Sequence, residues 1–145
     1  MINPFTKAAL LNSMFGKTST FGALATPPAI YVGLSSTTPG LDGSFNANGI
    51  TEPSGGSYAR VATTSSDWGA ATEGNNFAQV ANVNTITFPT ATADWSGGAN
   101  MTYAIFYDAP TGGNVLGVSA LATSQAVLNG QQASFAGGNI VWKIT

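Results

Sequence analysis

The sequence predicts a mainly β fold: a single β-sandwich or jelly-roll-like domain with a short N-terminal α-helix. Short runs rich in β-branched and aromatic residues recur at a spacing of roughly 8–12 residues, and there are about seven or eight of them. Clusters of Gly, Pro, Asn and Asp separate these runs and are typical of turns. Only the N-terminal stretch has the apolar spacing of an amphipathic helix.

Length and composition indicate one folded domain that is poor in charge. The chain has 145 residues, of which 43% are hydrophobic and 7% are charged, against a usual charged share of about 25%. We expect an N-terminal helix or arm over residues 1–16 and the β-sandwich domain over residues 17–145. A surface with so little charge fits either coverage by neighbours in an assembly or deep burial in a monomer.

The N-terminal helix is predicted to begin after Asn3, with Asn3 as the N-cap and Pro4 at the first helical position. Gly16 is suited to end it in a left-handed conformation. Apolar residues recur at helical spacing and predict a buried stripe: Phe5, Ala8, Leu11 and Phe15.

The predicted strands then follow in order, each with an apolar run or an alternating pattern. They are Ala29–Leu34, Ser57–Ala62, Thr85–Phe88, Tyr103–Tyr107, Val115–Leu121, Ser124–Leu128 and Asn139–Ile144. Two further segments, Phe77–Asn84 and Ala133–Phe135, are expected to be extended. Turn chemistry is expected at Thr72–Asn76, Asp108–Asn114 and Asn129–Gly130. Ser35–Glu52 is a long polar segment between the first two strands, and loops of this length are often functional.

The stretch Ile86–Asn114 is expected to form a strand pair at the centre of the core. Pro89 is predicted to end the first strand, because proline lacks the N–H that a central ladder needs. A flexible loop after Trp95 then leads to Tyr103–Tyr107, which is short and aromatic.

The residue content excludes most catalytic chemistry. There is no histidine and no cysteine, so the common nucleophilic triads and ordinary zinc sites are impossible. The six carboxylates are isolated and lie in or beside turn signals: Asp42, Glu52, Asp67, Glu73, Asp94 and Asp108. An EF-hand centred on Gly49 would need acidic residues at Ser44 and Gly55, so that interpretation fails and leaves an irregular calcium loop as the weaker alternative. We therefore predict no catalytic residue, no cofactor and no metal.

Four residues are candidates for a ligand site or an interface. Arg60 lies within a predicted strand, where an ion pair or a bridge to backbone carbonyls is favoured over an anchor at a subunit interface. Trp68, Trp95 and Tyr103 are candidates for a platform on which sugars stack, although aromatic residues in a β domain more often pack in the core. The four basic residues are scattered and no apolar run is long enough to cross a bilayer, so neither nucleic acid nor a membrane is expected as a partner.

The order of several segments resembles a family of small tailed-phage virion proteins, described as tail-fibre-like or structural. The resemblance covers almost the whole chain, and its most specific parts are Tyr31–Leu34, Gly56–Arg60, Ile86–Trp95 and Ile105–Gly113.

This resemblance implies a non-enzymatic virion structural protein that forms a homo-oligomer, with a trimer favoured. Its partners are then the major capsid protein or tail proteins of the same virion. The chain is short and lacks the repeats of a fibre shaft, so a capsid decoration or cement protein on the capsid surface is favoured over the tail. The alternative is a tail-fibre or tail-associated protein, including a receptor- or glycan-binding module.

Overall fold

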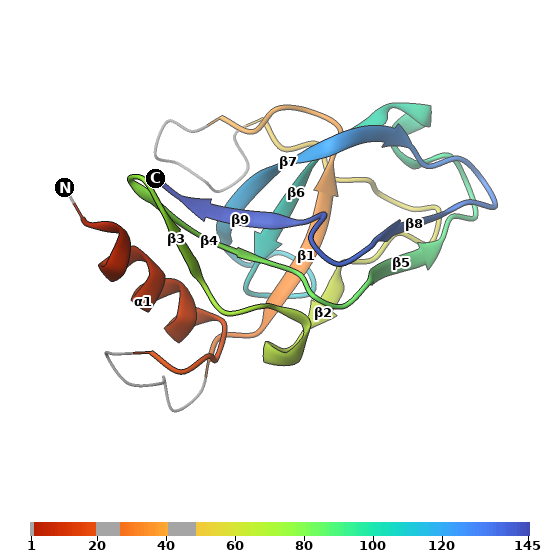
Figure 1. Ribbon diagram of the computed structural model, residues 1–145. Coiled ribbons are helices and arrows are strands. Elements are labelled where there is room, and N and C mark those ends of the chain that lie inside the picture. Colours follow the sequence, from red (N-terminus) through yellow and green to blue (C-terminus); the bar gives the residue numbers. More distant parts are fainter. Residues whose placement is uncertain (1, 20–26, 41–48) are drawn as a thin grey trace.

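The computed structural model describes residues 2–19, 27–40 and 49–145, and within them it contains one α-helix and nine strands. The elements are α1 (Pro4–Met14), β1 (Ile30–Ser35), β2 (Val61–Thr63), β3 (Thr72–Gly74), β4 (Phe77–Ala81), β5 (Ile86–Thr90), β6 (Asn100–Tyr107), β7 (Val115–Ala126), β8 (Gln132–Phe135) and β9 (Val141–Ile144). The predicted mainly β fold with an N-terminal helix is confirmed (Figure 1). Residues 41–48 of the polar segment, and with them most of the calcium-loop alternative, lie outside the described residues.

The strands form three antiparallel sheets around one core. Their orders are β2-β1-β6-β7, β3-β4-β9 and β5-β8. In the four-stranded sheet, Val32 is opposite Phe106 and Leu34 is opposite Ala104, and all four side chains are buried. These four side chains belong to one core cluster with apolar residues of the other two sheets.

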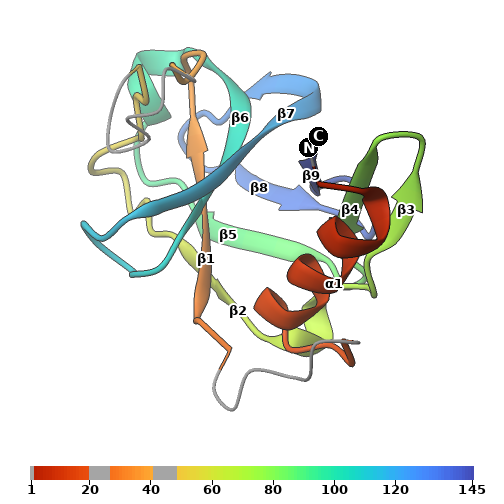
Figure 2. The same ribbon diagram turned by 90° about the vertical axis from the view of Figure 1, so that its left-hand side faces the viewer.

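The helix α1 has the boundaries that the sequence predicts. The Asn3 side chain accepts a hydrogen bond from the Thr6 N–H at 2.8 Å, and Gly16 adopts φ of +66°. The helix lies beside β3 and β4 (Figure 2) and contributes Ala8, Leu11 and Phe15 to the core. No helix of the described chain is both long and apolar enough to cross a bilayer.

The predicted apolar stripe of α1 is wrong at its first member. Phe5 is 48% exposed, whereas Lys7 is only 6% exposed. The Lys7 ammonium donates to the carbonyl of Asn76 at 2.7 Å, at the tip of the β3–β4 hairpin. Its alkyl chain therefore takes part in the packing of α1 on this hairpin.

The structure differs from two of the predicted elements, one strand and one turn. The predicted strand Ser57–Ala62 is replaced by the short β2, Val61–Thr63, because Tyr58 and Arg60 turn their side chains into a polar network described below. The predicted turn Thr72–Asn76 contains a strand, Thr72–Gly74, which pairs with β4. Its turn is reduced to two residues, and Asn76 accepts the left-handed φ of +68° that such a tight hairpin requires.

The strands within Ile86–Asn114 do not pair with one another. β5 pairs with β8, whereas β6 lies between β1 and β7 in a different sheet. Pro89 does not end β5 either: it lies inside the strand, within an irregularity of register between Thr87 and Thr90. A bulge is where a strand tolerates proline, because no ladder hydrogen bond is lost there.

Aromatic side chains fill the core where the sheets meet. Phe106 stacks on Trp142 with 4.8 Å between the ring centroids, and Phe15 meets the edge of Trp68 at the same distance. Gly117 on β7 makes this possible, since a Cβ atom there would lie 2.6 Å from the Trp142 ring. A second group, comprising Tyr58, Phe88, Trp95 and Phe135, packs by stacked or edge contacts.

A buried amide ties these sheets together. Asn82 follows β4 and is 1% exposed. Its Nδ2 lies 2.9 Å from the carbonyl oxygens of Asn84 and Ala136 and 3.3 Å from that of Phe135, and its Oδ1 accepts from the Ile140 N–H at 2.9 Å. Backbone bonds from Asn82 N to Ile140 O and from Gly138 N to Asn82 O complete the tie. One side chain thus fixes the connection between β8 and β9 against β4.

We predict that Asn82→Ala lowers the free energy of unfolding by about 3 kcal/mol, because several buried polar groups lose their partner at once. Urea unfolding of the purified chain measures this. Asn84→Ala is the matched control: it removes the same amide from an exposed position and should cost about 0.5 kcal/mol. Equal losses in the two variants would contradict the role given to Asn82.

Candidate functional site

The structure separates the aromatic candidates into different environments. Trp68 and Trp95 are each 1% exposed and donate their indole N–H groups inside the protein, to Thr63 Oγ1 at 3.0 Å and to the Gly56 carbonyl at 2.9 Å. Neither indole offers a face to solvent on which a sugar could stack. Tyr103 on β6 is half-buried, so it is the one aromatic candidate of the three whose side chain is partly exposed to solvent.

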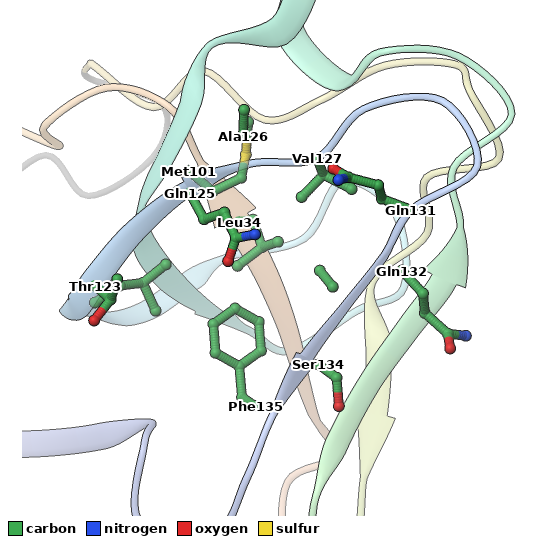
Figure 3. A pocket seen from close by; sticks show the side chains of 12 residues that line it. Leu34, Met101, Thr123, Gln125, Ala126, Val127, Gln131, Gln132, Ser134 and Phe135 are labelled. Atoms are coloured by element: carbon green, nitrogen blue, oxygen red, sulfur yellow. The ribbon is translucent and has the colours of Figure 1, made fainter.

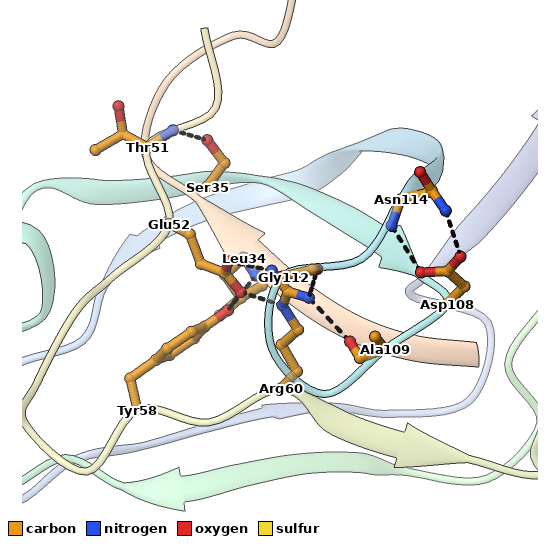
Figure 4. A network of polar contacts seen from close by, with 10 residues as sticks. All are labelled: Leu34, Ser35, Thr51, Glu52, Tyr58, Arg60, Asp108, Ala109, Gly112 and Asn114. Carbon is orange, nitrogen blue, oxygen red and sulfur yellow. Dashed lines mark hydrogen bonds and ion pairs between the residues drawn. The ribbon is translucent and has the colours of Figure 1, made fainter. Parts of the chain in front are cut away.

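Arg60 lies at the centre of a polar network beside the four-stranded sheet (Figure 4). Its guanidinium forms two parallel hydrogen bonds with Glu52, from Nε at 2.8 Å and from Nη2 at 2.7 Å. Nη1 donates to the carbonyl oxygens of Ala109 at 2.9 Å and Gly112 at 2.8 Å. The sequence favoured an ion pair or a carbonyl bridge, and the structure contains both; an anchoring role at a subunit interface stays a prediction.

The network also closes an open edge of β1. β2 is too short to pair with the end of β1, and the Leu34 N–H there donates to the Tyr58 hydroxyl at 2.9 Å. That hydroxyl in turn donates to Glu52 Oε1 at 2.7 Å. Burial, followed by the negative charge of Glu52, raises the pKa of Tyr58 above its ordinary range, so Tyr58 remains the neutral donor that this arrangement needs.

Tyr107 completes the packing around the ion pair. The Arg60 guanidinium carbon lies 3.2 Å from the centroid of the Tyr107 ring. Burial and then Glu52 raise the pKa of Tyr107 to about 12. Gly33 lies under this cluster, and a Cβ atom there would be 2.8 Å from Glu52 Oε1. The Arg60–Glu52 ion pair is therefore packed against aromatic rings and backbone. This environment indicates a role in holding the fold together.

The neighbouring loop is held by a separate carboxylate. Asp108 accepts from the Asn114 backbone N–H at 2.6 Å and from its side-chain amide at 2.8 Å. These bonds, the side-chain one first, hold the pKa of Asp108 below its usual range. The predicted turn Asp108–Asn114 is thus confirmed, and its carboxylate acts on its own loop.

A groove lies between β7 and β8 on the described surface (Figure 3). Its volume is about 350 Å³. The floor is apolar and is formed by Leu34, Met101 and Phe135, which come from β1, β6 and β8. Thr123 and Gln125 on β7 and Gln131 before β8 supply polar side chains at the rim. None of the described residues that line this groove is charged.

Sequence reasoning missed this groove. Its polar residues come from two strands and the turn between them, and each is an ordinary surface residue when taken alone. The available signal was the grouping of Gln125, Gln131 and Gln132 around the Asn129–Gly130 turn in a chain otherwise poor in long polar side chains. That turn is confirmed, with Gly130 at φ of +84°.

Comparison with known proteins identifies one family. The model of the Gp80 family, described as podophage GP4 fiber I protein gp80, matches residues 2–143. No curated protein matches the chain.

We predict that Arg60→Met lowers the free energy of unfolding by about 3 kcal/mol, because it leaves Glu52 partly buried without its partner. The Arg60 and Glu52 side chains are only 8% and 21% exposed. Arg60→Lys should recover part of the loss, since an ammonium cannot form both parallel bonds.

Lys143→Met is the matched control for this experiment. It removes an exposed cation that lies 3.8 Å from the Phe77 ring centroid and should cost about 0.5 kcal/mol. Urea unfolding measures all three variants. If Arg60→Met proved no more costly than Lys143→Met, the network would not have the structural weight assigned to it.

Proposed function

The chain belongs to the family of the podophage GP4 fiber I protein gp80, a family of phage virion structural proteins, and we propose that it is a non-enzymatic subunit of a phage tail fibre. The observation that carries this proposal is the extent of the family match, which spans residues 2–143 of 145. The matched region therefore includes the helix, all three sheets and the groove.

The family match changes the location that the sequence favoured. A capsid-surface position is not supported, because the matched family is described as a fibre protein. The absence of shaft-like repeats led to the capsid preference, but that argument concerns only the shaft of a fibre. A compact domain without repeats can form a fibre tip, a collar or a branch point instead.

The chemistry of the domain supports a role in binding. The sequence has no histidine or cysteine, and no three metal-ligating side chains group together among the described residues. Its buried and partly buried charges are engaged inside the protein: Arg60 pairs with Glu52, and Lys7 donates to the Asn76 carbonyl. The remaining surface consists mainly of neutral polar and small apolar residues, which are suited to contacts with other protein subunits.

Other proteins of the virion and tail are the partners in this proposal. We retain a homo-oligomer, with a trimer favoured, because closed symmetry multiplies contacts that are individually modest. Arg60 is retained as a lesser candidate for an interface residue. The reason is its exposed hydrogen bond to the carbonyl of Gly112, in the loop between β6 and β7.

Labelling of intact virions tests the fibre assignment. We expect antibodies raised against the purified chain to bind to fibres that project from the tail. Particles from which the gene has been deleted serve as the negative control. The same particles complemented with the gene in trans serve as the positive control. Labelling of the capsid shell, or absence of the protein from purified virions, would refute the proposal.

A further inference from the structure

The groove between β7 and β8 is formed by side chains from four strands that converge on one space. In Figure 3, the Phe135 ring, Leu34 and the carboxamide of Gln125 face each other from β8, β1 and β7. Its volume of about 350 Å³ is at the small end of the range for ligand sites, which is roughly 300–1,000 Å³.

The β7 wall is unsuited to pairing with another strand. Between Ala120 and Gln125, β7 advances by five residues while its partner β6 advances only from Tyr103 to Met101. The three extra residues of β7 form an irregularity that interrupts the regular backbone edge. Irregularities of this kind prevent edge-to-edge pairing, and the other wall, β8, is only four residues long. The shape therefore argues against an extended peptide as the occupant.

The chemistry of the lining selects a neutral ligand with both polar and apolar faces. Gln125 and Gln131 offer carboxamides and Thr123 offers a hydroxyl, whereas the floor offers the Phe135 ring and aliphatic carbon. Carboxamides and hydroxyls both donate and accept hydrogen bonds, as sugar hydroxyls do. An apolar floor matches the C–H face of a pyranose ring. With no charged residue among the described lining, an anionic ligand would find no counter-ion there.

The turn from Leu128 to Gln131, which borders the groove, is held by hydrogen bonds. Gln131 Oε1 accepts from the Leu128 N–H at 2.9 Å, which orients the Gln131 amide. The turn itself is anchored by the Asn129 N–H on Asp94 Oδ1 at 2.8 Å and by the Gly130 N–H on the Ala91 carbonyl at 2.7 Å. A ligand that binds here therefore meets a Gln131 amide that is already oriented.

We propose that this groove is a binding site for a short neutral saccharide. The proposal uses residues other than the buried tryptophans that the sequence offered as a sugar platform. The chemistry of the groove does not depend on the fibre assignment. Only the biological meaning of saccharide binding rests on that proposed function, because a fibre subunit can present its groove to a host surface.

A glycan array that carries neutral and acidic oligosaccharides tests the proposal with the purified chain. We expect binding to at least one neutral glycan and a preference for neutral over acidic ones. Thr123→Trp places a large ring at an exposed rim position and should abolish that binding. Gln125→Ala should weaken it about tenfold, as measured by calorimetry with the bound glycan.

Gln79→Ala is the matched control, because Gln79 is a glutamine on β4 that does not line the groove. It should bind as the unchanged chain does. The proposal is overturned if no neutral glycan binds, if only acidic glycans bind, or if the two groove variants bind normally. A change of oligomeric mass in Thr123→Trp would assign the groove to a subunit contact and would also overturn it. Virion labelling is a separate readout, so either proposal can fail while the other stands.

Discussion

The position of β8, and with it one wall of the groove, depends on the buried carboxamide of Asn82. The β5–β8 pair is a small sheet of its own, and such a two-stranded unit has little stability in isolation. Asn82 binds the carbonyl oxygens of Phe135 and Ala136 at the end of β8 and the N–H of Ile140 before β9. This neutral group satisfies several backbone groups at once, which suits a chain with few charges and no disulfides.

The ion pair of Arg60 and Glu52 also helps to satisfy a backbone group, at the β2 side of the four-stranded sheet. β2 leaves the end of β1 without a strand partner, and Tyr58, held by Glu52, supplies the missing acceptor. Two of the ten charged side chains are thereby placed inside the protein. The exterior is left with few charges, and contacts between neutral surfaces are the kind that a subunit packed among other fibre proteins requires.

Sequence reasoning succeeded where the signal is local. Asn3 and Gly16 bound the helix, and β1 and the Asp108–Asn114 turn are at the expected places, because capping, apolar runs and turn residues act over a few positions. It failed where partners are distant. The pairing of β5 with β8 and the burial of Lys7 depend on contacts with residues far along the chain. The groove was missed for the same reason, since its walls meet only after the β2-β1-β6-β7 sheet and the β5-β8 sheet have come together.

The central claim is that this domain is a fibre subunit whose groove faces outward. A cryo-electron microscopy map of the intact fibre, at a resolution that separates strands, tests that claim most directly. We predict that the domain fits the map at a symmetric position in the fibre with Thr123 and Gln125 at an open groove mouth. A domain located in the capsid shell, or one whose groove is filled by a neighbouring subunit, would contradict it.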